Sequence, residues 1–74
     1  MSDRASQLRS LEALLFISDE PVTSAVLAQA LGADRAAVDG LCEELAHGYE
    51  ERGSGITLRS VAGGWRLTTH PDAA

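Results

Sequence analysis

Residues 23–45, TSAVLAQALGADRAAVDGLCEEL, form the pattern of two helices joined by a tight corner. Either Thr23 or Ser24 can accept a hydrogen bond from a free backbone N–H and so begin the first of these helices. Gly32 suits the left-handed position that closes a helix, and Asp34 can cap the next one. The apolar residues of the first helix recur at helical spacing: Val26, Leu27, Ala30 and Leu31. The three-residue link between the helices has the length of a helix-turn-helix corner.

Another helix is predicted upstream of this pair, and it is the first helix in chain order. It is expected from about Ser6 to Ile17, because helical backbone is disfavoured just before Pro21. Its leucines form one stripe: Leu8, Leu11, Leu14 and Leu15. The helix that Asp34 caps is expected to reach about Arg52, with these residues on its core side: Val38, Leu41, Leu45 and Tyr49. Gly40 lies in the middle of that helix and is predicted to allow close packing against a neighbouring helix.

Glycine-rich turns and two alternating segments follow the helices. After a turn at residues 53–55, residues 56–59 and 65–68 each alternate apolar and polar side chains, which predicts two half-buried strands. Residues 61–64, Val-Ala-Gly-Gly, are the predicted hairpin, where the glycines allow positive φ. Three helices followed by a two-stranded wing predict a mainly α fold, the winged helix-turn-helix. We expect one such domain over residues 1–70, with residues 71–74 as the start of a linker or an artificial chain end.

The charge of the third predicted helix argues against the DNA binding that this fold commonly performs. Residues 34–52 carry six acidic side chains against only Arg35 and Arg52, a net charge of −4, and the whole chain carries −5. Groove binding depends on lysines and arginines that displace the counterions of DNA. Arg59 and Arg66 lie where a DNA-binding wing would contact phosphates, but we interpret them as solvated or paired with nearby acids. The pattern therefore favours a winged helix adapted to protein–protein contacts.

Catalytic, cofactor-binding and metal sites are not predicted. Cys42 is the only cysteine, which excludes an internal disulfide and is typical of a reducing cytosol. Cys42 and His47 lie about 140° apart around their helix and cannot share a metal on one face. Neither His47 nor His70 has an evident nucleophile or acid partner, so we expect no enzyme. The polar N-terminus predicts no signal peptide, and the longest apolar run is too short to span a membrane.

The first helix carries more apolar surface than one packed face requires. Phe16, Ala13 and Ile17 fall on the side opposite the leucine stripe. Either the domain's own core wraps the helix, or Phe16 and one rim of the helix face a second subunit. Trp65 on the wing has the same two interpretations, as a core residue or as an interface anchor. Four residues are therefore candidates for a protein interface: Leu8, Phe16, Ile17 and Trp65.

Two segments resemble the family of segregation and condensation protein B. Residues 12–21, EALLFISDEP, resemble its opening helix, and residues 55–69, GITLRSVAGGWRLTT, resemble its wing. The wing motif is fairly specific, above all Val-Ala-Gly-Gly followed by an aromatic residue and Arg66. The helix at residues 27–32 and the acidic helix that ends near Tyr49 also fit, and the resemblance runs from about Leu8 to Pro71.

The resemblance implies a bacterial, cytoplasmic and non-enzymatic protein with two winged-helix domains in tandem, of which this chain corresponds to the first. Members of the family form homodimers, chiefly through that first domain. They bind the kleisin subunit, segregation and condensation protein A, largely through the second domain. Through the kleisin they join the structural-maintenance-of-chromosomes (SMC) complex that condenses and segregates chromosomes. Two alternatives remain from the residues alone: a winged-helix DNA-binding regulator, and a docking domain of a larger enzyme.

Overall fold

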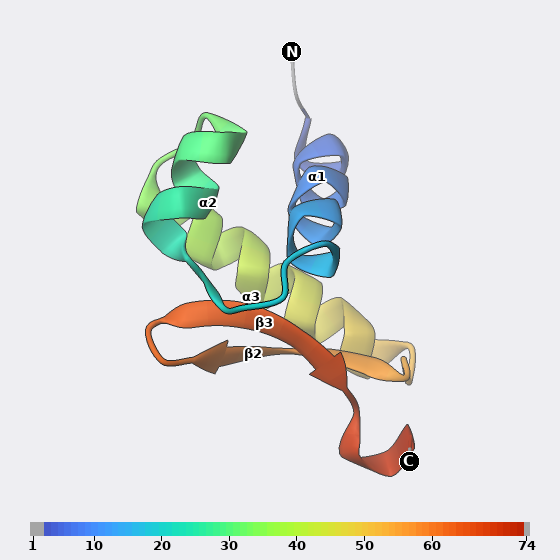
Figure 1. Ribbon diagram of the computed structural model, residues 1–74. Helices are drawn as coiled ribbons and strands as arrows, with labels where there is room; N and C mark the ends of the chain where they lie inside the picture. Colours follow the sequence, from blue (N-terminus) through green and yellow to red (C-terminus); the bar gives the residue numbers. More distant parts are fainter. Residues whose placement is uncertain (1–2, 74) are drawn as a thin grey trace.

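The computed structural model describes residues 3–73, and three helices lie on one face of a small antiparallel sheet (Figure 1). In chain order the elements are α1 (Arg4–Phe16), β1 (Val22–Thr23), α2 (Ser24–Leu31), α3 (Arg35–Glu51), β2 (Ile56–Val61), β3 (Gly64–Thr69) and a 3₁₀ turn, η1 (Pro71–Ala73). The fold is the predicted winged helix-turn-helix. Residues 1, 2 and 74, which fall in the predicted domain and linker, lie outside the described residues.

Short side chains begin each helix, as the sequence predicts for two of the three. Thr23 Oγ1 accepts a hydrogen bond from Val26 N at 3.2 Å, and Asp34 Oδ1 accepts from Ala37 N at 2.8 Å. Asp3 does the same for α1, which therefore begins at Arg4, two residues earlier than predicted. Gly32 closes α2 with φ 67°, in the left-handed region, as expected.

The sheet has a third strand that the sequence did not predict. The order is β1-β3-β2, and β1 pairs Val22 with Trp65 and Thr23 with Gly64. Two residues are too few for an alternating pattern, so β1 exists only because β3 lies beside it.

Close approach of β1 to β3 also corrects the predicted role of the second wing glycine. A Cβ added to Gly64 would lie 3.1 Å from backbone atoms of Pro21 and Val22. The positive φ angles of the hairpin belong instead to Ala62 (51°) and Gly63 (78°), the pattern of a type I′ turn.

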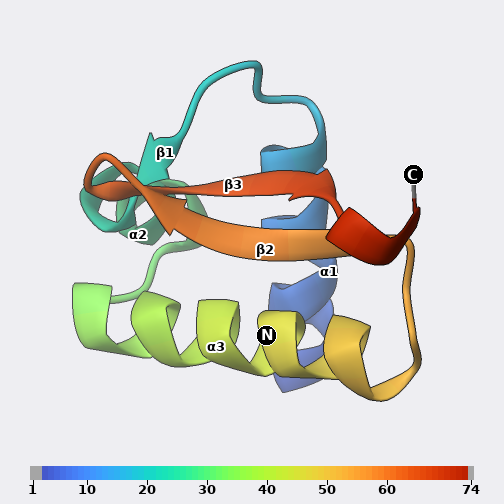
Figure 2. The same ribbon diagram turned by 90° about the horizontal axis from the view of Figure 1, so that it is seen from below.

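The core lies between the helices and the inner face of the sheet. Its buried members are Leu11, Leu15, Leu27, Ala28, Val38, Leu41, Cys42, Tyr49 and Leu58. Among residues 3–73 no helix covers the outer face of the sheet, which faces the reader in Figure 2. The interpretation of Gly40 was wrong: it is exposed, and a Cβ there would meet nothing within 4 Å among the described residues.

Candidate protein interface

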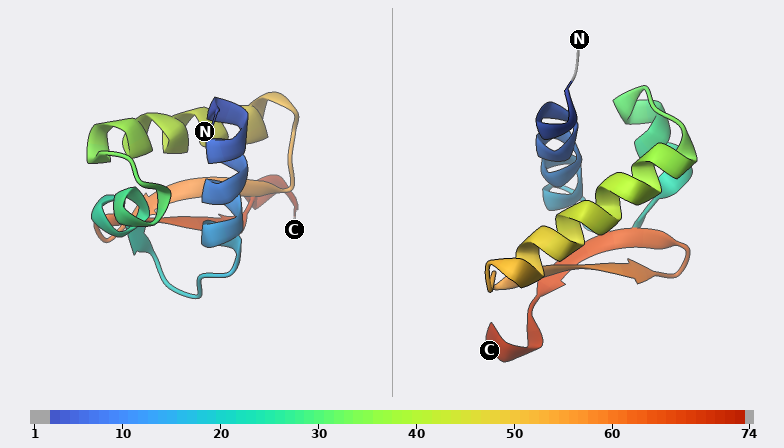
Figure 3. Two further views of the ribbon diagram at one scale, coloured as in Figure 1. Left: turned by 90° about the horizontal axis from the view of Figure 1, so that it is seen from above. Right: turned by 180° about the vertical axis from the view of Figure 1, so that it is seen from behind.

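The C-terminal end of α1 carries the most exposed large hydrophobic side chains of the described chain. Phe16 is 78% exposed and Ile17 is 74% exposed, so the domain's own core does not cover this rim of the helix. α2 lies on one side of α1 and α3 crosses behind it, while the remaining side of α1 has no neighbouring helix among the drawn elements (Figures 1 and 3). The uncovered side is therefore the side available to another molecule.

Phe16 borders an open groove between α1 and the wing. This α1–sheet groove has a volume of ≈ 470 Å³ and is lined by Arg9, Glu12, Ala13, Phe16, Ile56 and Leu67. A second hollow of ≈ 280 Å³ continues from it and shares three of these residues, Phe16, Ile56 and Leu67. The surface is mainly apolar at its centre, with one base and one acid contributed by α1. Such a composition suits contact with a protein, because apolar area supplies affinity and the charges supply orientation.

The four interface candidates from the sequence do not lie together. Phe16 borders the α1–sheet groove, and Ile17 lies exposed beside it at the helix end. Leu8 is half-buried and packs against the core, as does Trp65. Trp65 also donates a hydrogen bond from Nε1 to Ser24 Oγ at 3.1 Å, which holds its ring inside the domain.

Sequence reasoning missed four residues of the groove: Arg9, Glu12, Ile56 and Leu67. Helical spacing could have found two of them, since Arg9 and Glu12 share a helix face with Phe16. Glu12 is half-buried and accepts a hydrogen bond on Oε2 from the hydroxyl of Tyr49, a buried residue of α3. Burial, and next this hydrogen bond, raise the pKa of Tyr49 above its ordinary value, so the phenol remains a donor. The Glu12 carboxylate is therefore held in one orientation at the rim of the groove.

Within residues 3–73, the wing arginines form no ion pair with the acids of α3. Arg59 and Arg66 are exposed and face one another directly across β2 and β3, and neither forms an ion pair within residues 3–73. Three acids of α3 contact basic groups instead: Glu44 with Arg4, Glu50 with His70, and Glu51 with His47. These contacts offset the negative charge of α3 only locally, so the helix still repels a phosphate backbone.

Cys42 is a buried core residue without the features of a reactive thiol. Burial, and next the carboxylates of Asp39 and Glu43, raise its pKa from 9.0 to about 12, which keeps the thiol neutral. His47 on the same helix is exposed, so the two side chains diverge as the helical wheel predicts. Among residues 3–73 there is no cluster of three potential metal-ligating side chains. None of the helices described is long and apolar enough to cross a bilayer.

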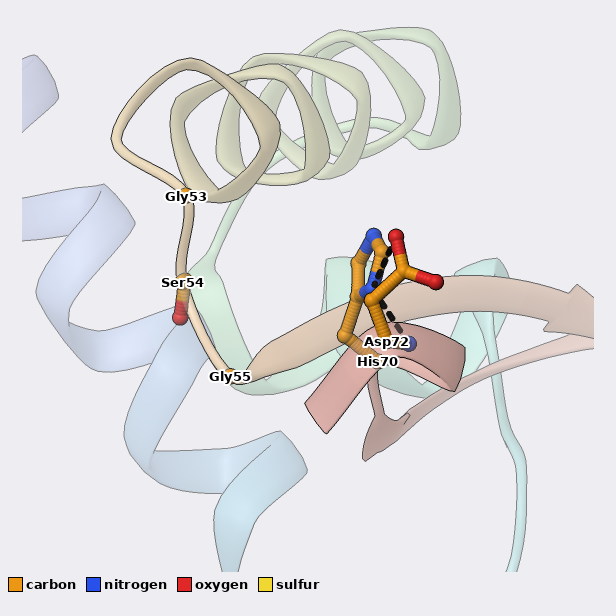
Figure 4. Close-up of a pocket in the computed structure, with 5 residues that line it drawn as sticks. All are labelled: Gly53, Ser54, Gly55, His70 and Asp72. Atoms are coloured by element: carbon orange, nitrogen blue, oxygen red, sulfur yellow. Dashed lines mark hydrogen bonds and ion pairs between the residues drawn. The ribbon is translucent and has the colours of Figure 1, made fainter. Parts of the chain in front are cut away.

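A shallow hollow of ≈ 220 Å³ near the C-terminus brings a serine, a histidine and an aspartate near one another (Figure 4). His70 Nδ1 accepts a hydrogen bond from the backbone N–H of Asp72 at 3.1 Å, and Nε2 lies 3.2 Å from Glu50 Oε2. Ser54 Oγ accepts from Ile56 N and points away from His70. Neither ring nitrogen of His70 thus has Ser54 as its partner, and the three side chains do not form a nucleophile–base arrangement.

The molecule is a winged-helix domain with an acidic third helix and an apolar groove beside the first helix. Comparison with known proteins places it more narrowly. The sequence model of the family described as "Segregation and condensation complex subunit ScpB" matches residues 9–74. The chain belongs to this family.

Relatives of known sequence carry the same family name. The chain is 42% identical over 64 residues to segregation and condensation protein B of Symbiobacterium thermophilum, covering 86% of this chain and 29% of the relative. It is 40% identical to the protein of that name from Moorella thermoacetica over 65 residues, covering 88% and 33% of the two chains. The chain therefore spans about a third of the length of these relatives.

Two solved structures match nearly the whole chain. ScpB from Mycobacterium tuberculosis superposes with a TM-score of 0.92 and 36% identity, over 97% of this chain and 45% of that one. The second is described as a dimer of the ScpB N-terminal domain complexed with ScpA peptide. It superposes with a TM-score of 0.88 and 26% identity, over 97% of this chain and 84% of that one.

Proposed function

We propose that this chain is the homodimerising domain of a non-enzymatic subunit in the bacterial SMC–kleisin complex, acting in chromosome condensation and segregation. The family supports this role, and so does the neighbour whose described state is a dimer bound to an ScpA peptide. In this proposal residues 1–70 are the first of two winged-helix domains, the residues after them begin the linker, and the protein acts in the cytoplasm. Its partners are a second copy, the kleisin segregation and condensation protein A and, through the kleisin, the SMC protein.

One observation supports a protein interface on this domain more than any other. Phe16 is 78% exposed at the end of α1, beside an apolar groove to which β2 and β3 each contribute a side chain. A domain of 74 residues has a small core and limited stability, so leaving such a side chain in water is costly. Dimerisation through this surface would bury Phe16 and enlarge the shared core. Leu8 and Trp65 then support the interface from within the domain.

The test is the solution mass of the chain by light scattering over a range of concentrations. Wild type is expected to shift from monomer to dimer, and Phe16→Glu is expected to remain monomeric because a carboxylate cannot be buried unpaired. Val26→Glu is the matched control, since Val26 is an exposed hydrophobic residue on α2, away from the groove. Wild type that stays monomeric at every concentration would contradict the proposal for this domain.

The second candidate function is that of a DNA-binding regulator, which the unpaired and adjacent Arg59 and Arg66 favour. Binding to duplex DNA that weakens with salt and is lost in an Arg59→Ala, Arg66→Ala double variant would support it. We expect no binding even at low salt, because the net charge of −5 and the acids of α3 outweigh two arginines.

A further inference from the structure

We propose that α1 pairs with α1 of a second copy in antiparallel orientation, with Arg9 of each copy bound to Glu12 of the other. This inference rests on the proposed dimerisation and adds to it the geometry of the interface and the residues that orient it.

The exposed face of α1 is a stripe of four residues. Arg9, Glu12, Ala13 and Phe16 stand at helical spacings of three, four and seven, so they lie on one side of the helix. All four line the α1–sheet groove; Glu12 is half-buried, and the other three are exposed. The small side chain of Ala13 at the middle of the stripe allows a second helix to approach closely.

The two charges of the stripe are available to a partner. Arg9 forms no ion pair within residues 3–73, and although Glu12 lines the same groove, the two groups do not reach 4.0 Å of each other. Glu12 Oε2 accepts the hydrogen bond from Tyr49, and Oε1 has no side-chain partner in the part of the chain described. The stripe thus offers one fixed acceptor and one free guanidinium, which is a self-complementary pair.

Symmetry determines how two such stripes can meet. Arg9 and Glu12 are about 4.5 Å apart along the helix axis, given a rise of 1.5 Å per residue. In a parallel pairing, Arg9 would face the partner's Arg9 and Glu12 would face the partner's Glu12, so that like charges would repel. In an antiparallel pairing about a two-fold axis between these positions, each Arg9 faces the partner's Glu12, and the contact occurs twice. The charges therefore favour one orientation and disfavour the other.

Charge reversal tests this pairing. Arg9→Glu alone and Glu12→Arg alone should each weaken the dimer at least about tenfold, because the stripe then carries two like charges that face the same two on the partner. An equimolar mixture of the two variants should recover a heterodimer, since a stripe with two acids meets a stripe with two bases. Sedimentation or native mass spectrometry measures the fraction of dimer in each single variant and in their mixture. Arg59→Glu, a reversal on the wing away from the groove, is the matched control and should dimerise as wild type does.

Glu12→Arg removes the contact with Tyr49, and that loss alone could disturb the fold. Glu12→Gln is therefore a second test of the pairing. Glutamine keeps an oxygen that can accept from the Tyr49 hydroxyl but removes the charge. The wild-type dimer should weaken as salt rises, whereas the Glu12→Gln dimer should be weaker at low salt and almost insensitive to salt.

The outcomes separate this inference from the function on which it rests. A wild-type dimer that Phe16→Glu disrupts, together with a mixture that forms no heterodimer or a Glu12→Gln dimer as tight as wild type, overturns the Arg9–Glu12 pairing. The dimerising function would then stand with a different geometry. A wild-type chain that is monomeric throughout overturns both.

Discussion

At the scale of single residues, the two glycines at positions 40 and 64 have opposite surroundings, although both lie within regular elements. Gly40 is exposed in α3 and has open space around its missing side chain, whereas Gly64 is buried against Pro21 and Val22. A glycine inside a helix is unfavourable unless contact demands it, and here nothing among the described residues does. Of these two glycines, only Gly64 is therefore required by the packing.

Alanine substitutions at the two positions should change stability in opposite directions. Gly40→Ala is expected to raise the free energy of unfolding by about 0.5–1 kcal/mol. Gly64→Ala is expected to lower it by about 1–3 kcal/mol, because the added methyl would lie 3.1 Å from backbone atoms of β1 and its flank. Urea unfolding followed by circular dichroism measures both. Equal destabilisation by the two variants would contradict the contrast.

Cys42 should make stability depend on pH in the alkaline range. Its pKa is raised from 9.0 to about 12 in the folded chain, so the unfolded chain loses the thiol proton first. The contribution is complete below pH 9 and is lost as pH rises from 9 towards 12, with a slope that approaches about 1.4 kcal/mol per pH unit. Cys42→Ala should flatten the fall between pH 9 and pH 10. Tyr49→Phe is the control and should flatten the fall mainly above pH 10, because an unfolded tyrosine is half-titrated at its ordinary pKa of 10.0.

At the scale of elements, one buried serine joins α2, α3 and the wing. Ser24 Oγ donates to Asp39 Oδ1 at 2.5 Å and accepts from Trp65 Nε1 at 3.1 Å. Ser24 is also the first residue of α2, directly after β1, so this contact fixes the start of α2 against α3 and the sheet. Asp39 thereby ties the inner side of the acidic α3 to the start of α2.

Removing that hydroxyl should loosen the attachment of the wing. Ser24→Ala leaves the Trp65 N–H and the Asp39 carboxylate without this partner, and should cost about 1–3 kcal/mol of unfolding free energy. The emission of Trp65, the only tryptophan, should shift as its hydrogen bond is lost. Ser10→Ala, at an exposed serine of α1, is the matched control and should change stability by less than about 0.5 kcal/mol. Identical behaviour of the two variants would contradict a structural role for Ser24.

At the scale of the whole molecule, the small core and the uncovered hydrophobic rim of α1 both favour association with a second copy. Residues 3–73 include nine buried hydrophobic core residues, while Phe16 and Ile17 remain in solvent. A second copy that covers them would stabilise the folded state by mass action. Folding and association are thus linked in the proposed dimer.

Linked association predicts that thermal stability depends on concentration. The melting temperature of wild type should rise as protein concentration rises, because dimer formation withdraws folded monomer from the unfolding equilibrium. That of Phe16→Glu should be constant, and calorimetry over a hundredfold concentration range compares them. A wild-type melting temperature that does not change would show that association contributes nothing to stability in this range.

Local chemistry explains which features of the fold could be predicted from the residues. Capping side chains, helical periodicity and Gly32 act through neighbours a few residues away, so the helices, the corner and the hairpin could all be predicted from the residues. The exposure of a rim of α1 was foreseen only as one of two alternatives, because the helical wheel shows where Phe16 points but not what covers it. The charge of α3 likewise follows from composition alone.

The contacts between distant segments depend on the tertiary structure. It created β1 by laying Val22 beside Trp65, and it required Gly64 through the approach of Pro21. It also turned Trp65 towards Ser24 and brought Ile56 and Leu67 to the side of Phe16, forty or more positions away in the chain. Such contacts leave no periodic trace in the sequence, since they depend on how the helices pack onto the sheet. The groove, and the charged stripe at its edge, are products of that packing.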